Sequence, residues 1–478
     1  MKPRALVVAA SEMTVRAFLG PQLRAMQEHY DVTVVVNSRA TDLLRDLGVA
    51  GTMEHIPLGR AISIPADIRA LFMLTRLMHR QRFDLVHSMT PKAGFLAMLA
   101  ARFSQIPIRI HTFTGQVWAT RTAVSRAILK LADRTIARCA TFTLADSPSQ
   151  RAFLIRERIA APDRIAVLGS GSVCGVDVER FRPDPIRRRH IREELRIPET
   201  SVVILFVGRL TRDKGVLDFA KAFAALAACP ERASASRGAE HGDLHAVVVG
   251  PDEQGLRSAM TRACASQSGR LHFLDYTNVP EAIMAASDVL CLPSYREGFG
   301  NVVIEAAAVG LPAVASRIYG LVDAVADERT GLLHEPGDIA DLTVCLRRVA
   351  GDLSLRHALG SAARDRVARD FAPSLITSGL LDLYARLAAD SSDESQGRWY
   401  RRFGKRAFDA VSAAAAIVLL LPLLAAVALI VRTLLGAPVL FWHSRPGLNG
   451  VPFWLVKFRT MTDRRDRAGT LLPDRPCP

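Results

Sequence analysis

The chain has 478 residues, of which 49% are hydrophobic and 23% are charged. This length predicts about three domains at roughly 150 residues each, and the composition is that of a globular protein with room for one membrane segment. The formal net charge is +15, and more than half of the excess falls in residues 398–478. Since no DNA- or RNA-binding motif is visible, the basic excess favours phospholipid or phosphate-bearing lipid over nucleic acid as a partner.

The N-terminus opens on one apolar run, Ala5–Ala10, which is too short for the core of a signal peptide and predicts a first strand. The seven cysteines form no Cys-x-x-Cys pair, which fits a reducing compartment and argues against a zinc site. We therefore expect the bulk of the chain to stay in the cytoplasm.

Short apolar runs then alternate with longer amphipathic stretches, which predicts βα repeats and parallel sheets. The first series of strands is expected at Ala5–Ala10, Val32–Val36, Leu85–His87, Ile106–Thr112 and Thr141–Ala145. The second series is expected at Ser201–Val207, Ala246–Gly250, Leu271–Leu274, Val289–Leu292, Ala313–Ser316 and Gly331–His334. The predicted fold class is therefore α/β, with two Rossmann-like doubly wound domains at residues 1–178 and 179–390.

Two cations follow the first strand of the second series. Arg209 and Lys214 come just after Ser201–Val207, at the end of a parallel strand where open α/β sheets bind ligands. We expect these two side chains to neutralise a diphosphate. A lone Arg and Lys at this spacing are more often simply solvated, so the interpretation depends on a second element.

That second element is a glycine-rich turn before a helix expected at Val302–Val309. Backbone amides at the turn and the positive end of the helix dipole favour an anion there. Glu297 and Glu305 flank the turn, and their carboxylates can accept hydrogen bonds from sugar hydroxyls. The candidate donor-binding residues of the segment are Gly298, Phe299, Gly300, Asn301 and Glu305. A lone Glu pair is usually a solvated helix face, but its occurrence after the Arg and Lys favours a sugar-nucleotide site.

These residues resemble the donor-binding half of the family 4 glycosyltransferases, which have the GT-B fold; the likeness covers about residues 1–390. The family pattern is an Arg and a Lys, then a Glu, seven residues and a second Glu. The resemblance implies that Arg209 and Lys214 hold the donor diphosphate, that Glu297 contacts the transferred sugar, and that Glu305 binds the ribose.

On the acceptor side, His111 lies at the end of a predicted strand and is the candidate catalytic residue of the N-terminal domain. Many relatives carry a His in the slot that Thr114 fills here, so this chain departs from the family pattern. The alternative is a strand-end histidine whose hydrogen bonds are satisfied.

After a polar linker at 391–397, residues 398–478 contain an apolar run, 410–431, that predicts a membrane helix. Pro422 divides the run, so a kinked spanning helix competes with a helix that enters, breaks and returns. The returning form is preferred because it keeps the flanking Arg and Lys on the cytoplasmic side. A buried soluble helix is the third alternative.

Residues 398–478 also resemble the start of the bacterial sugar transferases, which move a sugar phosphate onto polyprenyl phosphate. The matching stretches are Lys405–Asp409, Phe441–Gly447 and Lys457–Met461. That family's catalytic Asp-Glu pair lies farther downstream and is not found here. Since a covalent phosphosugar intermediate needs a carboxylate nucleophile, we interpret the segment as a membrane anchor with a truncated, inactive transferase domain.

Together these resemblances imply a retaining glycosyltransferase that moves a hexose or N-acetylhexosamine from a nucleotide sugar, UDP-linked by preference, to a lipid-linked saccharide acceptor in cell-surface polysaccharide synthesis. Its partners would be the nucleotide sugar, the acceptor and membrane phospholipid, at the cytoplasmic face of a bacterial inner membrane. We expect no cofactor and no metal, because no Asp-x-Asp motif stands where it could hold one. The alternatives are an initiating or bifunctional sugar-phosphate transferase, and a catalytically silent membrane scaffold.

Overall fold

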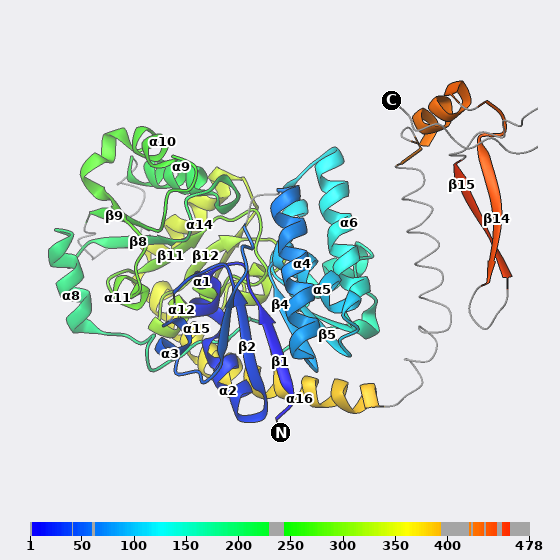
Figure 1. The fold of residues 1–478 in the computed structure, drawn as a ribbon. Helices are drawn as coiled ribbons and strands as arrows, with labels where there is room; N and C mark the ends of the chain where they lie inside the picture. The colour runs from blue at the N-terminus through cyan, green and yellow to red at the C-terminus, as the bar shows by residue number, and fades with distance from the viewer. Residues whose placement is uncertain are drawn as a thin grey trace, which may run out of the picture. The chain divides into compact units, whose positions relative to one another are not determined.

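The computed structural model describes residues 2–40, 42–59, 63–228, 243–392, 420–421, 424–434, 436–446 and 452–458. The chain divides into two compact units, Met1–Ser391 and Ser392–Pro478. The first unit contains two parallel sheets with helices around them, as Figure 1 shows. The predicted α/β class with two doubly wound sheets is thereby confirmed for this unit.

The N-terminal sheet has seven parallel strands in the order β3-β2-β1-β4-β5-β6-β7. In chain order the strands are β1 (Arg4–Val8), β2 (Asp31–Val36), β3 (Thr52–His55), β4 (Leu85–Met89), β5 (Ile108–Phe113), β6 (Phe142–Ala145) and β7 (Ile165–Val167). Strands β3 and β7 were not among the predicted strands. Strand β3 is a polar edge strand with no buried residue, and β7 has three residues, so neither gives an apolar run.

Helices cover both faces of this sheet, and two core clusters mark the two layers. One layer contains α4 (Ile64–Gln81), α5 (Pro91–Phe103), α6 (Ala123–Cys139) and α7 (Pro148–Arg156). The other contains the π-helical turn Val15–Leu19, α2 (Gly20–His29), α3 (Leu43–Asp46) and α16 (Pro373–Ser392). A short helix, α1 (Glu12–Thr14), precedes the π-helical turn, and Val117–Thr120 forms a 3-10 turn before α6.

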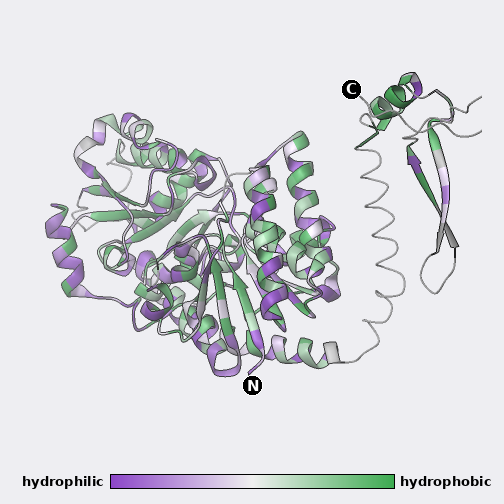
Figure 2. Ribbon diagram, in the orientation of Figure 1, coloured by the Kyte–Doolittle hydropathy of each residue, from purple (hydrophilic) through white to green (hydrophobic). Residues whose placement is uncertain are grey.

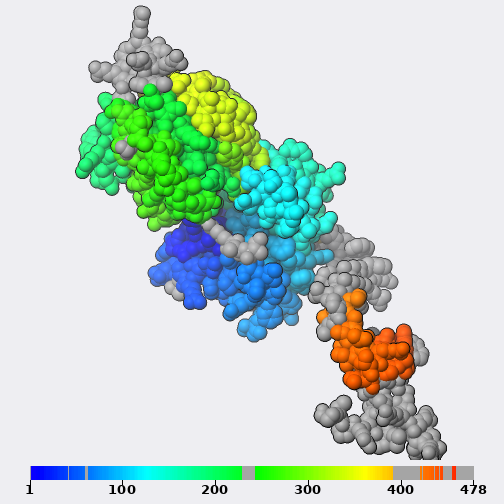
Figure 3. All heavy atoms as spheres, turned by 90° about the horizontal axis from the view of Figure 1, so that it is seen from above, coloured from blue at the N-terminus to red at the C-terminus, as the bar shows by residue number. Residues whose placement is uncertain are grey.

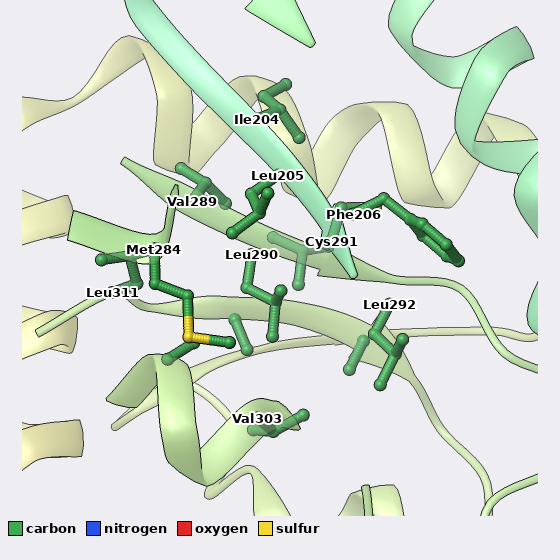
Figure 4. Packing of buried hydrophobic residues seen from close by; sticks show 14 of the residues in the cluster. Ile204, Leu205, Phe206, Met284, Val289, Leu290, Cys291, Leu292, Val303 and Leu311 are labelled. Carbon is green, nitrogen blue, oxygen red and sulfur yellow. The ribbon is translucent and has the colours of Figure 1, made fainter. Parts of the chain in front are cut away.

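The C-terminal sheet has six parallel strands in the order β10-β9-β8-β11-β12-β13. They are β8 (Val202–Val207), β9 (Leu244–Val249), β10 (Leu271–Leu274), β11 (Val289–Leu292), β12 (Ala313–Ser316) and β13 (Gly331–His334). The helices are α8 (Pro185–Glu194), α9 (Val216–Ala227), α10 (Arg257–Ala263), α11 (Pro280–Ala285), α12 (Asn301–Val309), α13 (Leu321–Ala324), α14 (Ile339–Gly351) and α15 (Leu353–Asp370). Figure 4 shows Leu205 of β8 and Leu290 of β11 on the side of the sheet that faces Met284, with Val303 of α12 below.

Helix α16 follows the second sheet in sequence but packs against the first. Its Tyr384 is fully buried, and the tyrosine OH lies 2.5 Å from Nδ1 of His87 on β4. Tyr30, at the end of α2, contacts the Tyr384 ring edge-on with centroids 5.9 Å apart. The last helix of the first unit therefore holds the two sheets together by completing the N-terminal core. It also extends to Ser392, across the first two residues of the predicted linker.

The second unit contains an antiparallel pair, β14 (Leu440–Pro446) and β15 (Pro452–Phe458). Of the predicted membrane helix 410–431, residues 420–421 and 424–431 are described and helical, while the rest, Pro422 included, lies outside the described residues. Among the residues that are described, no helix is both long enough and apolar enough to cross a bilayer.

Candidate active site

The order of the C-terminal sheet determines where a ligand can bind. Strand β8 is the first strand of this half, and it lies between β9 and β11, so connections leave it toward opposite faces. Open α/β sheets bind ligands outside the carboxyl ends of the strands at such a switch point. Arg209 and Lys214 follow β8, and Glu297 follows β11, so all three lie at this point of the sheet.

The two loops at the switch point pack directly on each other. Gly215, with φ +67°, comes so close to the Pro293 carbonyl oxygen that any Cβ would overlap it. The Tyr295 amide donates to the Asp213 carbonyl at 2.9 Å. This close contact requires glycine at position 215, and it brings the β8 and β11 loops into one rigid arrangement.

Lys214 and Glu297 are in direct contact. The lysine Nζ donates to Glu297 Oε1, and Ser294 Oγ donates to the same oxygen at 3.0 Å. The side chains are 21% and 12% exposed, so both are largely withdrawn from water but still reachable by a ligand. A cation and a carboxylate held together in this way can bind a phosphate oxygen and a sugar hydroxyl side by side.

Arg209 lies at the rim of the same loop pair. Its guanidinium forms an ion pair with Glu253, in the loop after β9, with 2.8 Å between Nη1 and Oε2. The two side chains are 35% and 34% exposed, and a pair this exposed contributes little to stability. Arg209 can therefore exchange Glu253 for a phosphate at small cost.

The glycine turn between Glu297 and α12 touches the N-terminal half of the unit. A Cβ on Gly298 would lie 2.9 Å from the Gly115 amide nitrogen, and Arg296 Nη1 donates to the Gly115 carbonyl at 2.9 Å. Gly300 adopts φ +87° immediately before α12. The turn thus needs glycine for close approach at one position and for backbone conformation at the other.

The two other residues of this turn have structural contacts. The Phe299 side chain is 2% exposed and packs on Phe371, with centroids 5.4 Å apart, so its backbone alone can reach a ligand. Asn301 Oδ1 accepts from Ser172 Oγ at 3.1 Å. These contacts fix the turn against Phe371 and Ser172.

Glu305 lies one helical turn after Asn301 on α12. Burial raises its pKa to about 7, against the lowering effect of the Arg180 charge, and Glu281 adds to the rise. Within the described chain it has no hydrogen-bond partner. A mostly buried carboxyl group that accepts no hydrogen bond can bind a pair of vicinal hydroxyls. No described contact joins Glu305 or Arg209 to the Lys214–Glu297 pair.

Further contacts close the two halves on each other beside the site. Ser149 Oγ accepts from the Gly320 amide at 2.7 Å, and the Ser149 amide donates to Asp323 Oδ2 at 2.8 Å. The Phe153 and Tyr319 rings stack with centroids 4.5 Å apart. In the space-filling view of Figure 3 the cyan part of the N-terminal half adjoins the yellow-green part of the C-terminal half.

Asp146, which the sequence analysis missed, lies at the centre of this contact. It is 5% exposed, its Oδ1 has no hydrogen-bond partner in the described chain, and its Oδ2 lies against Gly298. Burial raises the pKa of Asp146 to about 8, and the Glu297 carboxylate adds to the rise. At neutral pH Asp146 is thus a neutral carboxylic acid beside Glu297, the carboxylate that is expected to contact the sugar. Its place directly after β6 is the signal that could have identified it.

His111 lies elsewhere in the fold. It is 1% exposed within β5, its Nδ1 is 2.9 Å from Ser88 Oγ, and its ring fills the space beside Gly94. Burial lowers the pKa of His111 to about 3, with a smaller contribution from His87. His111 is therefore a buried strand histidine with a hydrogen-bond partner inside the fold. A role of His111 in activating the acceptor stays a prediction that the geometry does not support.

Comparisons with known families fit this architecture. Residues 187–366 match the family model described as glycosyl transferases group 1, and residues 14–171 match the glycosyl transferase 4-like domain. Residues 400–475 match the bacterial sugar transferase model.

In the described residues no group of three or more His, Cys, Asp or Glu side chains could hold a metal ion.

Individual relatives point the same way. The chain is 29% identical over 338 residues to the capsular polysaccharide biosynthesis glycosyltransferase CapM of Staphylococcus aureus, covering 70% of this chain and 85% of the relative. It is 29% identical over 367 residues to an Escherichia coli UDP-Gal:alpha-D-GlcNAc-diphosphoundecaprenol alpha-1,3-galactosyltransferase, covering 75% and 89%. It is 33% identical over 342 residues to D-inositol 3-phosphate glycosyltransferase 2 of Catenulispora acidiphila, covering 66% and 74%.

Solved structures share the fold. The crystal structure of Anabaena Alr3699/HepE in complex with UDP and glucose superposes with a TM-score of 0.66 at 18% identity, covering 80% of this chain and 100% of that one. WaaG, a glycosyltransferase involved in lipopolysaccharide biosynthesis, has a TM-score of 0.59 at 18% identity, covering 79% and 99%. The chain belongs to the group 1 glycosyltransferases and carries a C-terminal bacterial sugar transferase segment.

Proposed function

We propose that the chain is a retaining glycosyltransferase that moves a hexose or N-acetylhexosamine from a UDP-sugar to a lipid-linked saccharide in capsule or related cell-surface polysaccharide synthesis. The observation that carries the proposal is the contact between Lys214 and Glu297 at the switch point of the C-terminal sheet. A group that binds phosphate and a group that binds sugar hydroxyls are held side by side, as a nucleotide sugar requires.

The donor diphosphate would be held by three positive elements. Lys214 supplies one charge beside Glu297, and Arg209 supplies a second at the rim. The N-terminal end of α12 supplies backbone amides and the helix dipole. Glu305 would accept hydrogen bonds from the ribose hydroxyls. UDP is the proposed nucleotide because the Anabaena structure of the same fold holds UDP and glucose.

The acceptor is inferred from relatives rather than from the site. The Escherichia coli relative is named for transfer to a diphosphoundecaprenol-linked sugar, and the Staphylococcus aureus relative for capsular polysaccharide synthesis. A lipid-linked acceptor implies work at the cytoplasmic face of the inner membrane. Residues 398–478, with their basic and apolar composition, would hold the protein there through phospholipid.

In the proposed reaction the acceptor hydroxyl attacks the anomeric carbon from the face that the diphosphate leaves. The bond from that carbon to the phosphate oxygen breaks, the new glycosidic bond forms, and the hydroxyl proton passes to the departing diphosphate. Lys214, Arg209 and the start of α12 stabilise the negative charge that develops on the diphosphate. No metal ion is needed for this step, because the protein's own cations carry out that task.

Release of UDP from UDP-sugars in the presence of lipid-linked acceptors tests the proposal. We expect release that persists in chelator, falls about 100- to 1,000-fold in kcat in Lys214→Ala, and falls through a raised donor KM in Glu305→Ala. A matched control is Lys221→Ala, on the partly surface-exposed helix α9, which should leave release unchanged. Strict dependence on a divalent metal, or full activity of Lys214→Ala, would contradict the proposed site.

The match of residues 400–475 to the bacterial sugar transferase model supports a second candidate, transfer of a sugar phosphate to polyprenyl phosphate. The products distinguish the two. Transfer of the sugar alone releases UDP, whereas transfer of the sugar phosphate breaks the bond between the two phosphates and releases UMP. Detection of UMP with polyprenyl phosphate as acceptor would support the second candidate.

A further inference from the structure

Asp146 belongs to the N-terminal half, but its side chain faces the C-terminal half. It follows β6 directly, and the strands of both sheets are mostly hydrophobic, as Figure 2 shows. Its Oδ2 lies so close to Gly298 that a Cβ added there would overlap it, and 5% of Asp146 is exposed. The carboxyl group therefore lies inside the contact between the two halves, beside the residue that follows Glu297.

The backbone of Asp146 is held on both sides. Its amide donates to Gln150 Oε1 at 2.6 Å, and its carbonyl accepts from the Ser172 amide at 2.8 Å. Gln150 in turn donates to the Thr114 carbonyl at 2.8 Å, so three separate segments of the N-terminal half fix the position of Asp146. Relief of an unfavourable contact at its carboxyl group therefore has to come from the facing turn of the C-terminal half.

No cation compensates this carboxyl group. Within the described residues Asp146 forms no ion pair, and its Oδ1 has no hydrogen-bond partner. The two cations of the neighbouring loops are occupied, since Lys214 is bound to Glu297 and Arg296 lies 3.4 Å from Asp213. Burial of a neutral carboxylic acid is tolerable in such a place, whereas burial of a carboxylate without a donor or a cation is far costlier.

The titratable groups that face Asp146 also favour its protonated form. Burial raises the pKa of Asp146 to about 8, and the Glu297 carboxylate on the facing turn adds to the rise. Cys174, on the loop that joins the two halves, is a thiol whose pKa is raised by burial first and then by Glu305 and Asp146. Gln150, from α7, carries no charge. Ionisation of Asp146 would thus bring a second carboxylate beside Glu297.

We propose that Asp146 is a positioning residue for the transfer reaction: as a carboxylic acid it allows Glu297 and the glycine turn to close on the N-terminal half, and as a carboxylate it drives the turn away. On ionisation the proton passes to water, and no other covalent bond forms or breaks. Asp146 acts through Glu297 and Gly298 and does not itself touch the donor. Its part in transfer rests on the proposed function, in which Glu297 contacts the donor sugar.

The consequence for the donor is electrostatic. While Asp146 is protonated, Lys214 has a single acidic partner and can be shared between Glu297 and the donor diphosphate. When Asp146 is ionised, two carboxylates lie near this cation and repel the diphosphate. Transfer should therefore have an alkaline limit, which appears as a rise in the donor KM more than as a fall in kcat.

A donor-free distance measurement on the full-length chain tests the closing of the two halves. Spin labels are attached at Ile128→Cys on α6 and Val344→Cys on α14, where the side chains are 59% and 49% exposed. The other cysteines to be replaced, by serine, are Cys139, Cys229 and Cys477. Double electron–electron resonance then gives the distances between the labels at about pH 5 and about pH 9.

The matched control is Asp133→Asn. Asp133 is also an acid of the N-terminal half that is 5% exposed, and it accepts from the Trp118 indole at 2.7 Å within that half. Burial raises the pKa of Asp133 to about 6, against the lowering effect of the Trp118 hydrogen bond. Asp133 therefore titrates in the same pH range without lying against the glycine turn.

We expect a population with a longer distance to grow toward pH 9 in the wild-type chain. The closed form keeps a proton that an open form with the ordinary pKa of 3.8 loses, so the ratio of open to closed chains should rise by up to about tenfold for each pH unit until about pH 8. Asp133→Asn should respond as the wild type does. Asp146→Asn should keep the short distance at both pH values, because its amide is neutral and of nearly the same size.

Two results would overturn the proposal: equal wild-type distances at both pH values, or an Asp146→Asn chain that opens as the wild type does. A second measurement links the closing to transfer. The wild-type donor KM should rise severalfold between pH 7 and pH 9, and Asp146→Asn should flatten this rise; an undiminished rise in the variant would refute the positioning role. Since the distance measurement needs no donor, a chain that opens with pH but transfers no sugar at any pH would refute the proposed function and leave the closing device in place.

Discussion

Replacing Lys214 by Met tests whether its ammonium group serves the donor or merely neutralises Glu297. The lysine is 21% exposed and its partner 12%. The methionine keeps most of the side-chain volume but leaves the Glu297 carboxylate with Ser294 Oγ as a hydrogen-bond donor and without its cation.

Two different losses follow. Leaving a mostly buried carboxylate without its charged partner costs about 1–3 kcal/mol of folding free energy. If Lys214 also stabilises the leaving diphosphate, the reaction barrier rises by a further ~3–4 kcal/mol, which lowers kcat about 100- to 1,000-fold. Urea unfolding measures the first loss, and nucleoside diphosphate release measures the second.

The double variant Lys214→Met with Glu297→Gln separates the two roles. The glutamine removes the unpaired charge, so folding stability should return to within about 1 kcal/mol of the wild-type value. Activity should stay low, because neither the cation nor the carboxylate is present for the donor. Recovery of activity together with stability in the double variant would refute a catalytic role for Lys214.

Other substitutions test neighbouring parts of the structure. Because burial raises the pKa of Asp146 from its ordinary 3.8 to about 8, the folded chain keeps a proton that the unfolded chain loses. This group therefore lowers the stability as the pH rises between these values. Asp146→Asn should reduce the fall in unfolding free energy between pH 5 and pH 8, measured by urea unfolding, and an unchanged fall would contradict the placement of the acid. Tyr384→Ala should cost about 3–5 kcal/mol by opening a cavity under α16, and Tyr384→Phe much less; equal unfolding midpoints for both would speak against the packing of α16. Gly94→Ala should destabilise the fold by about 1–3 kcal/mol because its Cβ would enter the space of the His111 ring, a loss that thermal unfolding would detect. Glu305→Gln should raise the donor KM while leaving the unfolding midpoint in place, and an unaltered KM would remove Glu305 from the donor site.

The strands of the C-terminal half were predictable because each is a short, mostly apolar run between turn residues, with at most one His or Ser in it. The expected and observed bounds agree for Leu271–Leu274, Val289–Leu292, Ala313–Ser316 and Gly331–His334. Buried parallel strands leave this signal in any sequence. A polar edge strand such as Thr52–His55 does not.

The site was predictable in part, since its cations and acids follow strand ends in sequence. The contact of Lys214 with Glu297 fits that logic. The position of Asp146 directly after a predicted strand was an available signal, but the approach of Asp146 and Gly115 to the glycine turn depends on how the two halves close on each other. Helix α16 returns to the first sheet for a reason that is visible only in its buried Tyr384. Such long-range packing leaves no local pattern in the sequence.

A crystal structure of the full-length chain with a bound UDP-sugar tests the proposed donor site most directly. We expect a diphosphate oxygen within hydrogen-bond distance of Lys214 Nζ, Arg209 turned from Glu253 toward the same diphosphate, and the sugar against Glu297. A donor bound elsewhere, with Lys214 and Arg209 still held by their present acidic partners, would contradict it.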